Sequence, residues 1–348
     1  LLRRVGHIRV FLAMSAIASA APLIHGLVVE PIIWGVLRFL TGFCLASLYI
    51  VIESWLNERS TNANRGVIFS TYSMITLTMM AAGQMMNLLY NPVGLQLFVI
   101  SSILFSIGAV PIALSVSPSP DQPASTKTDI RELFHTSPSG TVGCFAVGLA
   151  NGAFWGLAPL YAAATGNDIS MAAWFMAAAI IGGAILQWPL GLLSDAVSRR
   201  KVLVAVCFLG AAAGLALAFL APRFGVVSII LLGGVWGAFA FPLYSIVVAY
   251  VNDYADHGDY VKVSAGLLLV YGIGAIIGPF VASALITLRG ADGLFLFTAA
   301  VHVLLIGFVM YRFAREGTQA DEPIAFGDAL SAAQTASQVY EEELQEQQ

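Results

Sequence analysis

Two stretches of the sequence, LYIVIESWLNE at 48–58 and LYSIVVAYVND at 243–253, align without a gap at an offset of 195 residues. At the same offset Leu37 aligns with Leu232 and Gly42 with Gly237. Apolar helices often resemble one another by chance, but an asparagine followed by an acidic residue at the end of both stretches is a less common coincidence. The alignment therefore indicates a chain built from two related halves.

Small shifts extend this repeat outward from the two stretches. The further matches are Arg3-Arg4 with Arg199-Arg200, Ala21-Pro22 with Ala221-Pro222, and Gly66 with Gly266. Halves that repeat in the same orientation are known in membrane transporters. Two apolar spans precede Arg199 and none precedes Arg3, so we expect an intact protein of twelve helices, truncated here at its N-terminus in the loop after the second helix.

The composition indicates that lipid surrounds most of the chain. Of 348 residues, 58% are hydrophobic and 10% are charged, with a mean hydropathy of +0.83; soluble domains carry about 25% charged residues. No basic run with interleaved aromatic residues indicates nucleic-acid binding. The cysteines Cys44, Cys144 and Cys207 stand alone inside apolar runs, which favours packing over metal or disulfide chemistry.

Apolar runs of about 20 residues, separated by polar breaks, predict membrane-spanning helices. Ten runs qualify: 9–28, 31–53, 66–89, 95–115, 140–164, 170–193, 201–220, 226–251, 263–288 and 293–313. We therefore predict an all-α membrane protein with two pseudo-symmetric helix bundles. The predicted parts are an N-terminal bundle at 1–115 (helices 3–6 of the intact fold), a cytoplasmic linker at 116–139, a C-terminal bundle at 140–314 (helices 7–12) and an acidic cytoplasmic tail at 315–348.

The distribution of Lys and Arg predicts the orientation. Alternate loops hold thirteen of the sixteen basic residues, and basic loops stay in the cytoplasm. The beginning of the chain, the linker and the tail are therefore predicted to be cytoplasmic, as in a multi-pass protein of the bacterial inner (plasma) membrane.

The segment GLLSDAVSRRK at 191–201 resembles the cytoplasmic loop motif of the major facilitator superfamily, G-x-L-[AS]-D-[RK]-x-G-R-R. It lies between the second and third helices of its half, where that motif belongs. Ala196 replaces a basic residue of the motif and Ser198 replaces a glycine. Asp195 and both arginines are kept.

A second set of residues resembles the YcaD-like branch of that superfamily. The order of these residues along the chain is Trp34, Arg38-Phe39, Gly42, Glu53-Ser54, Asn64-Arg65-Gly66, Gly183, Gln187-Trp188-Pro189-Leu190-Gly191, Tyr271, Gly274 and Gly278-Pro279. The resemblance implies a secondary transporter, not an enzyme, that moves a small solute by alternating access and is commonly coupled to protons. It implies no cofactor besides the proton as coupling ion, and we expect a monomer.

Charged side chains inside spans are costly and are functional candidates by default. Arg38 lies within a span, and by resemblance it matches an arginine linked to proton coupling; the alternative is pairing with backbone carbonyls or with a carboxylate on the absent helices. Glu53 is either a proton-binding carboxylate or, as the residues themselves favour, a helix-end gate that pairs with Arg59 or Arg65.

Uncharged polar side chains in the spans are candidates for a solute cavity. Each one singly is more often a hydrogen-bonding partner for a neighbouring helix, and a cluster around one cavity would favour the solute. The candidates are Gln84, Asn87, Asn151, Tyr161, Gln187, Tyr244 and Tyr271.

Two motifs are candidates for moving parts. Gly191, Asp195, Arg199 and Arg200 form a predicted cytoplasmic gate motif, whose alternative is an ordinary loop ion pair. The predicted helix bend consists of Gly274, Gly278 and Pro279, and tight packing alone is the equal alternative.

Other functional classes have weaker support in the sequence. The polar loop with Asp253, Asp256, His257 and Asp259 lacks metal-ligand spacing, so we expect no metal site there. His25 and His302 are isolated, which disfavours a membrane enzyme. A non-transporting receptor or an inactive transporter fragment remains the alternative to a carrier.

Overall fold

The computed structural model describes residues 6–58, 65–91, 94–115, 130–166, 168, 170–253 and 260–316. These residues form helices and no strands. Most of the predicted linker (116–129), most of the tail (317–348) and the loop with Asp256, His257 and Asp259 lie outside the described residues, as do Arg3, Arg4, Arg59 and Lys127.

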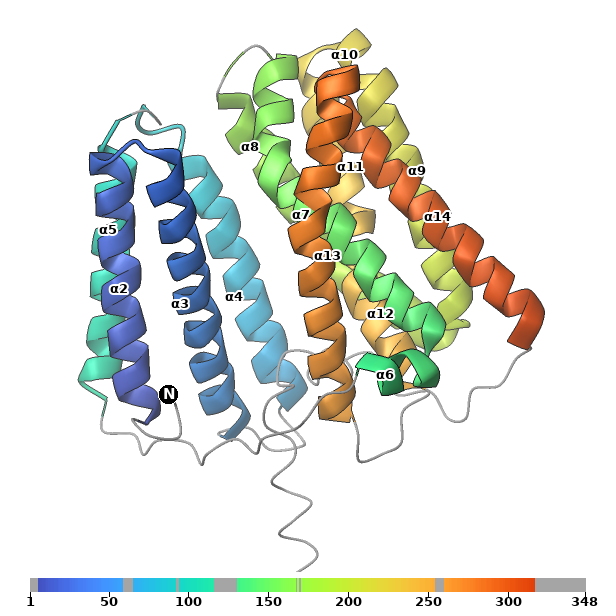
Figure 1. Cartoon of the computed structure of the whole chain (residues 1–348), viewed down its shortest axis with the longest axis horizontal. Coiled ribbons are helices and arrows are strands. Elements are labelled where there is room, and N and C mark those ends of the chain that lie inside the picture. The colour runs from blue at the N-terminus through green and yellow to red at the C-terminus, as the bar shows by residue number, and fades with distance from the viewer. Residues whose placement is uncertain are drawn as a thin grey trace, which may run out of the picture. The chain divides into compact units, whose positions relative to one another are not determined.

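The chain divides into two compact units, with α4 (Arg65–Met86) divided between them. The first unit contains α2 (His7–Leu27), α3 (Pro31–Glu58) and α5 (Gln96–Ala113). The second contains α6 (Ile130–Thr136), α7 (Pro138–Gly166), α8 (Ser170–Ala196), α9 (Arg199–Phe219), α10 (Ala221–Phe224), α11 (Val226–Ala240), α12 (Leu243–Asn252), α13 (Tyr260–Arg289) and α14 (Gly293–Glu316) (Figure 1).

Nine helical spans among the described residues are long and apolar enough to cross a membrane, and they match nine of the ten predicted spans. The tenth prediction, 66–89, falls on α4, which is helical but is not among the nine. In hydrocarbon a helix satisfies its own backbone hydrogen bonds, which explains why long apolar runs fold into helices here. Gly290, with φ +81°, ends α13 in a left-handed conformation that glycine adopts without strain.

The predicted span 226–251 is interrupted, since α11 ends at Ala240 and α12 begins at Leu243. Pro242 explains the interruption, because it has no N–H to donate to the carbonyl four residues earlier. The remainder of the span is thus a separate helix of ten residues.

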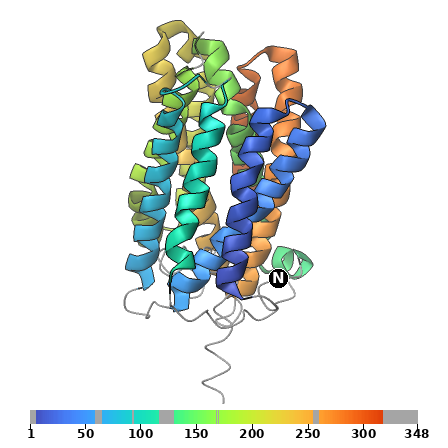
Figure 2. The ribbon, with the colours of Figure 1, turned by 90° about the vertical axis from the view of Figure 1, so that its left-hand side faces the viewer.

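The repeat appears in the packing of each unit. In the first unit, whose helices are blue to blue-green in Figure 2, α2 packs against α3 and α5. In the second unit α9 packs against α11 and α14. The sequence repeat pairs α2 with α9, α3 with α11–α12, and α5 with α14, so related helices make related contacts.

The second unit has the larger core. Six aromatic rings from α7, α8, α11 and α14 and from the residue after α11 meet in it: Phe154, Tyr161, Phe175, Trp236, Phe241 and Phe295. The first unit has a smaller core, which is formed by residues of α2 and α3: Val10, Phe11, Met14, Ala18, Cys44, Leu48 and Val51.

Candidate functional site

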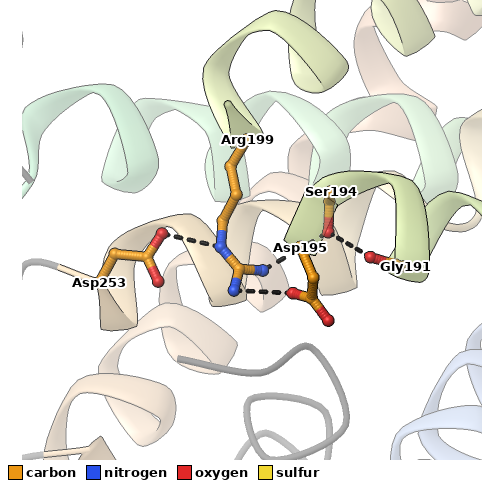
Figure 3. A network of polar contacts seen from close by, with 5 residues as sticks. All are labelled: Gly191, Ser194, Asp195, Arg199 and Asp253. Atoms are coloured by element: carbon orange, nitrogen blue, oxygen red, sulfur yellow. Dashed lines mark hydrogen bonds and ion pairs between the residues drawn. The ribbon is translucent and has the colours of Figure 1, made fainter. Parts of the chain in front are cut away.

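A buried arginine joins three helices at the end of the second unit where α8 ends and α9 begins (Figure 3). The Arg199 Nη2 atom lies 2.9 Å from Asp195 Oδ1, and its Nε atom lies 2.7 Å from Asp253 Oδ2. The side chains of Arg199 and Asp253 are 4% and 6% exposed, whereas Asp195 is 30% exposed. Asp253 directly follows α12, so the arginine ties the end of α12 to the α8–α9 connection.

A serine completes this ion-pair network. Ser194 Oγ donates to the Gly191 carbonyl at 2.7 Å and accepts a longer contact of 3.4 Å from Arg199 Nη1. Ser194 therefore contacts both the arginine and the last turns of α8. We refer to Ser194, Asp195, Arg199 and Asp253 as the ion-pair network below.

The second arginine of the motif makes a different set of contacts. Arg200 Nη2 donates to the Tyr250 hydroxyl at 2.9 Å, and its guanidinium lies over the rings of Tyr250 and Phe313. Arginine stacks on aromatic faces in this way because its planar cation is weakly hydrated. Arg199 and Arg200 thus both hold the end of α12, one by charge and one by an aromatic contact.

Four of the predicted cavity residues make contacts that link α7, α8, α12 and α13. The Asn151 amide is within side-chain hydrogen-bonding reach of the Tyr271 hydroxyl. The rings of Tyr271 and Tyr244 meet edge to face, with centroids 4.9 Å apart. Gln187 Nε2 donates to Ser245 Oγ at 2.8 Å, next to Tyr244 in the chain. We call Asn151, Gln187, Tyr244, Ser245 and Tyr271 the polar cluster.

Tyr161, another predicted cavity residue, lies in the aromatic core instead. It is 1% exposed, and its hydroxyl donates to the Leu217 carbonyl on α9 at 2.7 Å. Its ring packs against Phe175 and Phe295. The observed contact of Tyr161 is therefore a hydrogen bond to a neighbouring helix, which is the alternative stated above for each polar side chain taken singly.

Glycines let α13 approach α7 closely. A Cβ atom on Gly274 would lie 2.3 Å from the Phe145 carbonyl oxygen, and one on Gly278 would lie 2.1 Å from that of Leu149. Pro279 lies inside α13, which runs unbroken from Tyr260 to Arg289. The close contact is therefore present, whereas the moving role of these residues stays a prediction.

A second close approach joins α8 to α11. A Cβ atom on Gly182 would lie 2.0 Å from the Gly234 carbonyl oxygen, and one on Gly237 would lie 2.1 Å from that of Ala179. Small residues at such contacts allow two backbones to meet, which is a common way to associate helices in membranes.

The remaining predicted residues lie on α3 and at the end of α4. Arg38 is exposed on α3, and Glu53 is half-buried at the last residue of the apolar part of that helix. Gln84 is half-buried in the last turn of α4, and Asn87 is exposed just after it. Their roles stay predictions.

Sequence reasoning missed three residues of these two groups. The sequence pattern places Asp253 in a polar loop and singles out neither Ser245 nor Ser194, although Ser194 fills the [AS] position of the motif at 191–201. For Asp253 a signal existed, because the repeat aligns it with another acidic helix end, but its arginine partner lies 54 residues earlier and no pattern in the chain connects the two. Ser194 has a signal in its motif position, whereas Ser245, inside an apolar run, has no distinguishing signal of its own.

Comparison with known proteins identifies the family. The sequence model of the Major Facilitator Superfamily matches residues 140–339. A protein of Salmonella newport (strain SL254) described as an uncharacterized MFS-type transporter, YcaD, is 28% identical over 332 residues, which cover 93% of this chain and 83% of the relative. A YcaD protein of Salmonella heidelberg (strain SL476) is 27% identical over 337 residues, with the same coverage.

Solved structures share the fold. A variant of the nucleoside transporter NupG has a TM-score of 0.69 at 14% identity, over 89% of this chain and 84% of that one. A variant of the E. coli fucose:proton symporter FucP has a TM-score of 0.54 at 15% identity, over 90% and 85% of the two chains. The membrane helices, their repeated packing and the matched family together show that this chain is a multi-pass membrane protein that belongs to the major facilitator superfamily, a family of transporters and not of enzymes.

Proposed function

We propose that this protein is a secondary transporter that moves a small solute by alternating access and is driven by protons. We place it in the bacterial inner membrane as a monomer with both ends of the chain in the cytoplasm. Family membership supports solute transport across a membrane. The residue-level mechanism rests on one observation, which is the position of α12 between the polar cluster and the ion-pair network.

The short helix α12 contributes to both groups of residues. Tyr244 and Ser245 in its first turn belong to the polar cluster, and Asp253 just after its last turn belongs to the ion-pair network. Nine residues of helix separate Tyr244 from Asp253, or about 13 Å. The break at Phe241–Pro242 frees the start of α12 from the hydrogen-bonding ladder of α11.

This arrangement gives a physical route from solute binding to gating. A solute that draws Tyr244 or Ser245 out of their present contacts tilts α12 about the break. The tilt is transmitted along the helix to Asp253, where it strains the pair with Arg199. In the proposal the ion-pair network is therefore intact while the inner face is closed, and it separates when that face opens.

The network has the energetics that a reversible gate needs. Buried charges attract one another strongly, but they also lose their hydration, so the net stabilisation of a buried pair is small compared with its electrostatic energy. When the inner face opens, water hydrates Arg199 and Asp253 again and offsets most of the lost attraction. A pair of this kind specifies one closed arrangement without making it too stable to leave.

For proton coupling we propose the first unit. Glu53 is a carboxylate at the end of an apolar span, and Arg38 lies fifteen residues before it on the same helix. Fifteen residues correspond to about 22 Å along the axis, so the two side chains do not pair directly. We assign proton binding to Glu53 and propose that Arg38 provides positive charge within the same membrane helix.

Transport is tested with the native protein, expressed from its own gene and reconstituted into vesicles that contain a pH-sensitive dye. Solutes are added singly from a chemically diverse panel, and uptake is followed together with the internal pH. At least one solute should enter and acidify the vesicles, and Glu53→Gln should abolish the acidification. If no solute moves while a known symporter works in parallel vesicles, the transporter proposal fails. If solute moves without protons, only the coupling fails.

A further inference from the structure

We infer that the polar cluster takes an uncharged solute that carries hydroxyl or amide N–H donors next to a flat apolar face. This inference rests on the proposed function and names the chemical class of its solute. Three features of the second unit support it: the lack of charge inside its membrane helices, a buried acceptor and the packing of four aromatic rings.

Away from their ends, the membrane helices among α7–α14 of the second unit offer no counter-charge to an ionic solute. Between residues 141–165, 171–194, 202–219, 226–252, 263–288 and 293–311 the sequence contains no Asp, Glu, Lys or Arg. His302 lies within the last range, but it is buried against α9 at Gly210 and not in the polar cluster. An ion that leaves water without a partner loses far more hydration energy than these neutral groups can restore.

The cluster contains an acceptor that no described residue satisfies. Asn151 is 4% exposed, and its Oδ1 atom is buried without a hydrogen-bond donor. The same side chain contacts the Tyr271 hydroxyl. This contact orients the Asn151 amide, while its Oδ1 atom lacks a donor. A buried carbonyl oxygen without a donor is costly and calls for a specific explanation. An O–H or N–H group of a solute supplies the missing donor.

Aromatic rings lie beside this acceptor. Trp155 is one helical turn from Asn151 on α7, and its ring stacks on Phe241 with centroids 5.3 Å apart and an angle of 7° between the planes. Tyr244 and Tyr271 follow on α12 and α13. Ring surfaces beside a few polar groups suit a solute with both an apolar face and hydrogen-bonding edges.

The arrangement of the rings argues against a cationic solute. A site for a quaternary ammonium group turns several ring faces toward one point. Here Trp155 turns one face to Phe241, and Tyr244 and Tyr271 meet edge to face at 62°. The rings therefore pack on one another and do not form a cage, and no carboxylate belongs to the cluster.

Among the described spans, Arg38 on α3 is the one Lys or Arg that lies away from the span ends, so it is the candidate partner of an anionic solute. That residue belongs to the first unit and makes no part of the polar cluster. Anions are therefore the main rival class in the experiment, and Arg38→Gln is the variant that identifies them.

The experiment measures the melting temperature of the detergent-purified native protein with three groups of probes. The neutral probes are myo-inositol and uridine, the cationic probe is choline and the anionic probe is benzoate. We expect a rise in Tm that grows with the concentration of a neutral probe and is absent for choline and benzoate. Asn151→Leu should abolish the rise, and Tyr271→Phe, which removes a single hydroxyl, should reduce it even if Asn151→Leu does not fold.

Thr287→Val serves as the matched control, because Thr287 lies on α13 outside the cluster and its hydroxyl bonds only to the Ser283 carbonyl of its own helix. This variant should retain the full rise in Tm. A rise confined to choline, or one confined to benzoate and lost in Arg38→Gln, overturns the inference. So does the absence of a rise with every probe, or a neutral-probe rise that Tyr271→Phe leaves unchanged.

Binding and transport fail in separable ways. If a neutral probe raises Tm but does not enter vesicles, the inferred solute class is supported and the transport proposal fails. If a charged solute enters vesicles, the transport proposal is supported and the inferred solute class is wrong.

Discussion

The two bundles come from one repeat, yet their matching helices differ in continuity and charge. At the offset of 195 residues, Ser47 of α3 aligns with Pro242, and α3 is unbroken where the second bundle is divided into α11 and α12. Two charges within the span of α3 are also replaced, because Arg38 aligns with Gly233 and Glu53 with Val248, whereas Glu58 at its end aligns with the acidic Asp253. One copy thus keeps ionisable groups on a continuous helix, and the other keeps an interrupted helix of neutral residues.

This difference indicates how the two copies of a duplicated bundle can take different functions in transport. A continuous helix holds a charge at a fixed depth, which suits the proposed proton binding in the first unit. An interrupted helix can move one segment against the other, which suits the proposed gating by α12. Neither property follows from the overall fold, since both copies keep the same helix contacts.

Removal of Arg199 should give the largest effect. Arg199→Met removes the guanidinium that pairs with the buried Asp253 carboxylate, and breaking a buried pair of this kind costs about 3–5 kcal/mol. We expect a large fall in Tm, measured in detergent by tryptophan fluorescence, and loss of transport. Arg223→Met, at an exposed arginine, is the control and should change Tm little. Restoration of Tm in the double variant Arg199→Met/Asp253→Asn would confirm that the loss of the Arg199–Asp253 charge pair is the cause.

Exchange of the aligned Ser47 and Pro242 tests the difference in continuity. Ser47→Pro places a proline inside α3, where it should cost about 3 kcal/mol or more. Pro242→Ala restores the missing N–H, so it should raise Tm while it slows transport by stiffening the break. Equal transport rates in Pro242→Ala and wild type would show that the interruption has no role in gating.

The aligned glycines test the close packing. Gly237→Ala places a Cβ atom 2.1 Å from the Ala179 carbonyl oxygen, and overpacking of this kind costs about 1–3 kcal/mol. At Gly42 no described atom lies within 4 Å of the added Cβ, so Gly42→Ala should stabilise α3 by up to about 1 kcal/mol. The Tm values of the two variants should therefore move in opposite directions. A fall of equal size in both would contradict the packing described.

The smallest effect is expected just before α14. Burial raises the pKa of the Asp292 carboxyl, whereas the residue before α5 is the uncharged Leu95. Because the folded pKa lies above the unfolded value, the protonated form stabilises the fold at low pH, and this stabilisation is lost as pH rises through the folded pKa. The side chain of the Asp292→Asn variant is uncharged at every pH, so the variant should keep this stabilisation at neutral pH. Its Tm should therefore decline less between pH 4 and pH 7 than the Tm of wild type. Identical pH profiles would show that Asp292 is well hydrated.

The sequence predicted the helical elements well because the membrane imposes a length and an apolar composition that can be read residue by residue. It also predicted the Asp195–Arg199 contact, which lies within one short segment. It did not predict the interruption at Phe241–Pro242, because prolines also lie inside continuous helices here, as Pro279 does in α13.

By itself, then, the sequence determined the membrane class, the repeat and the motif between α8 and α9, since each depends on composition or on residues close together in the chain. Only the tertiary structure decided which polar side chains meet. The members of three contacting pairs lie at least 50 residues apart in sequence: Asn151 and Tyr271, Gln187 and Ser245, and Arg199 and Asp253. Glycines allow the close approach of α7 to α13, on which the first contact depends. That approach is set by the packing of whole helices, which no local pattern encodes.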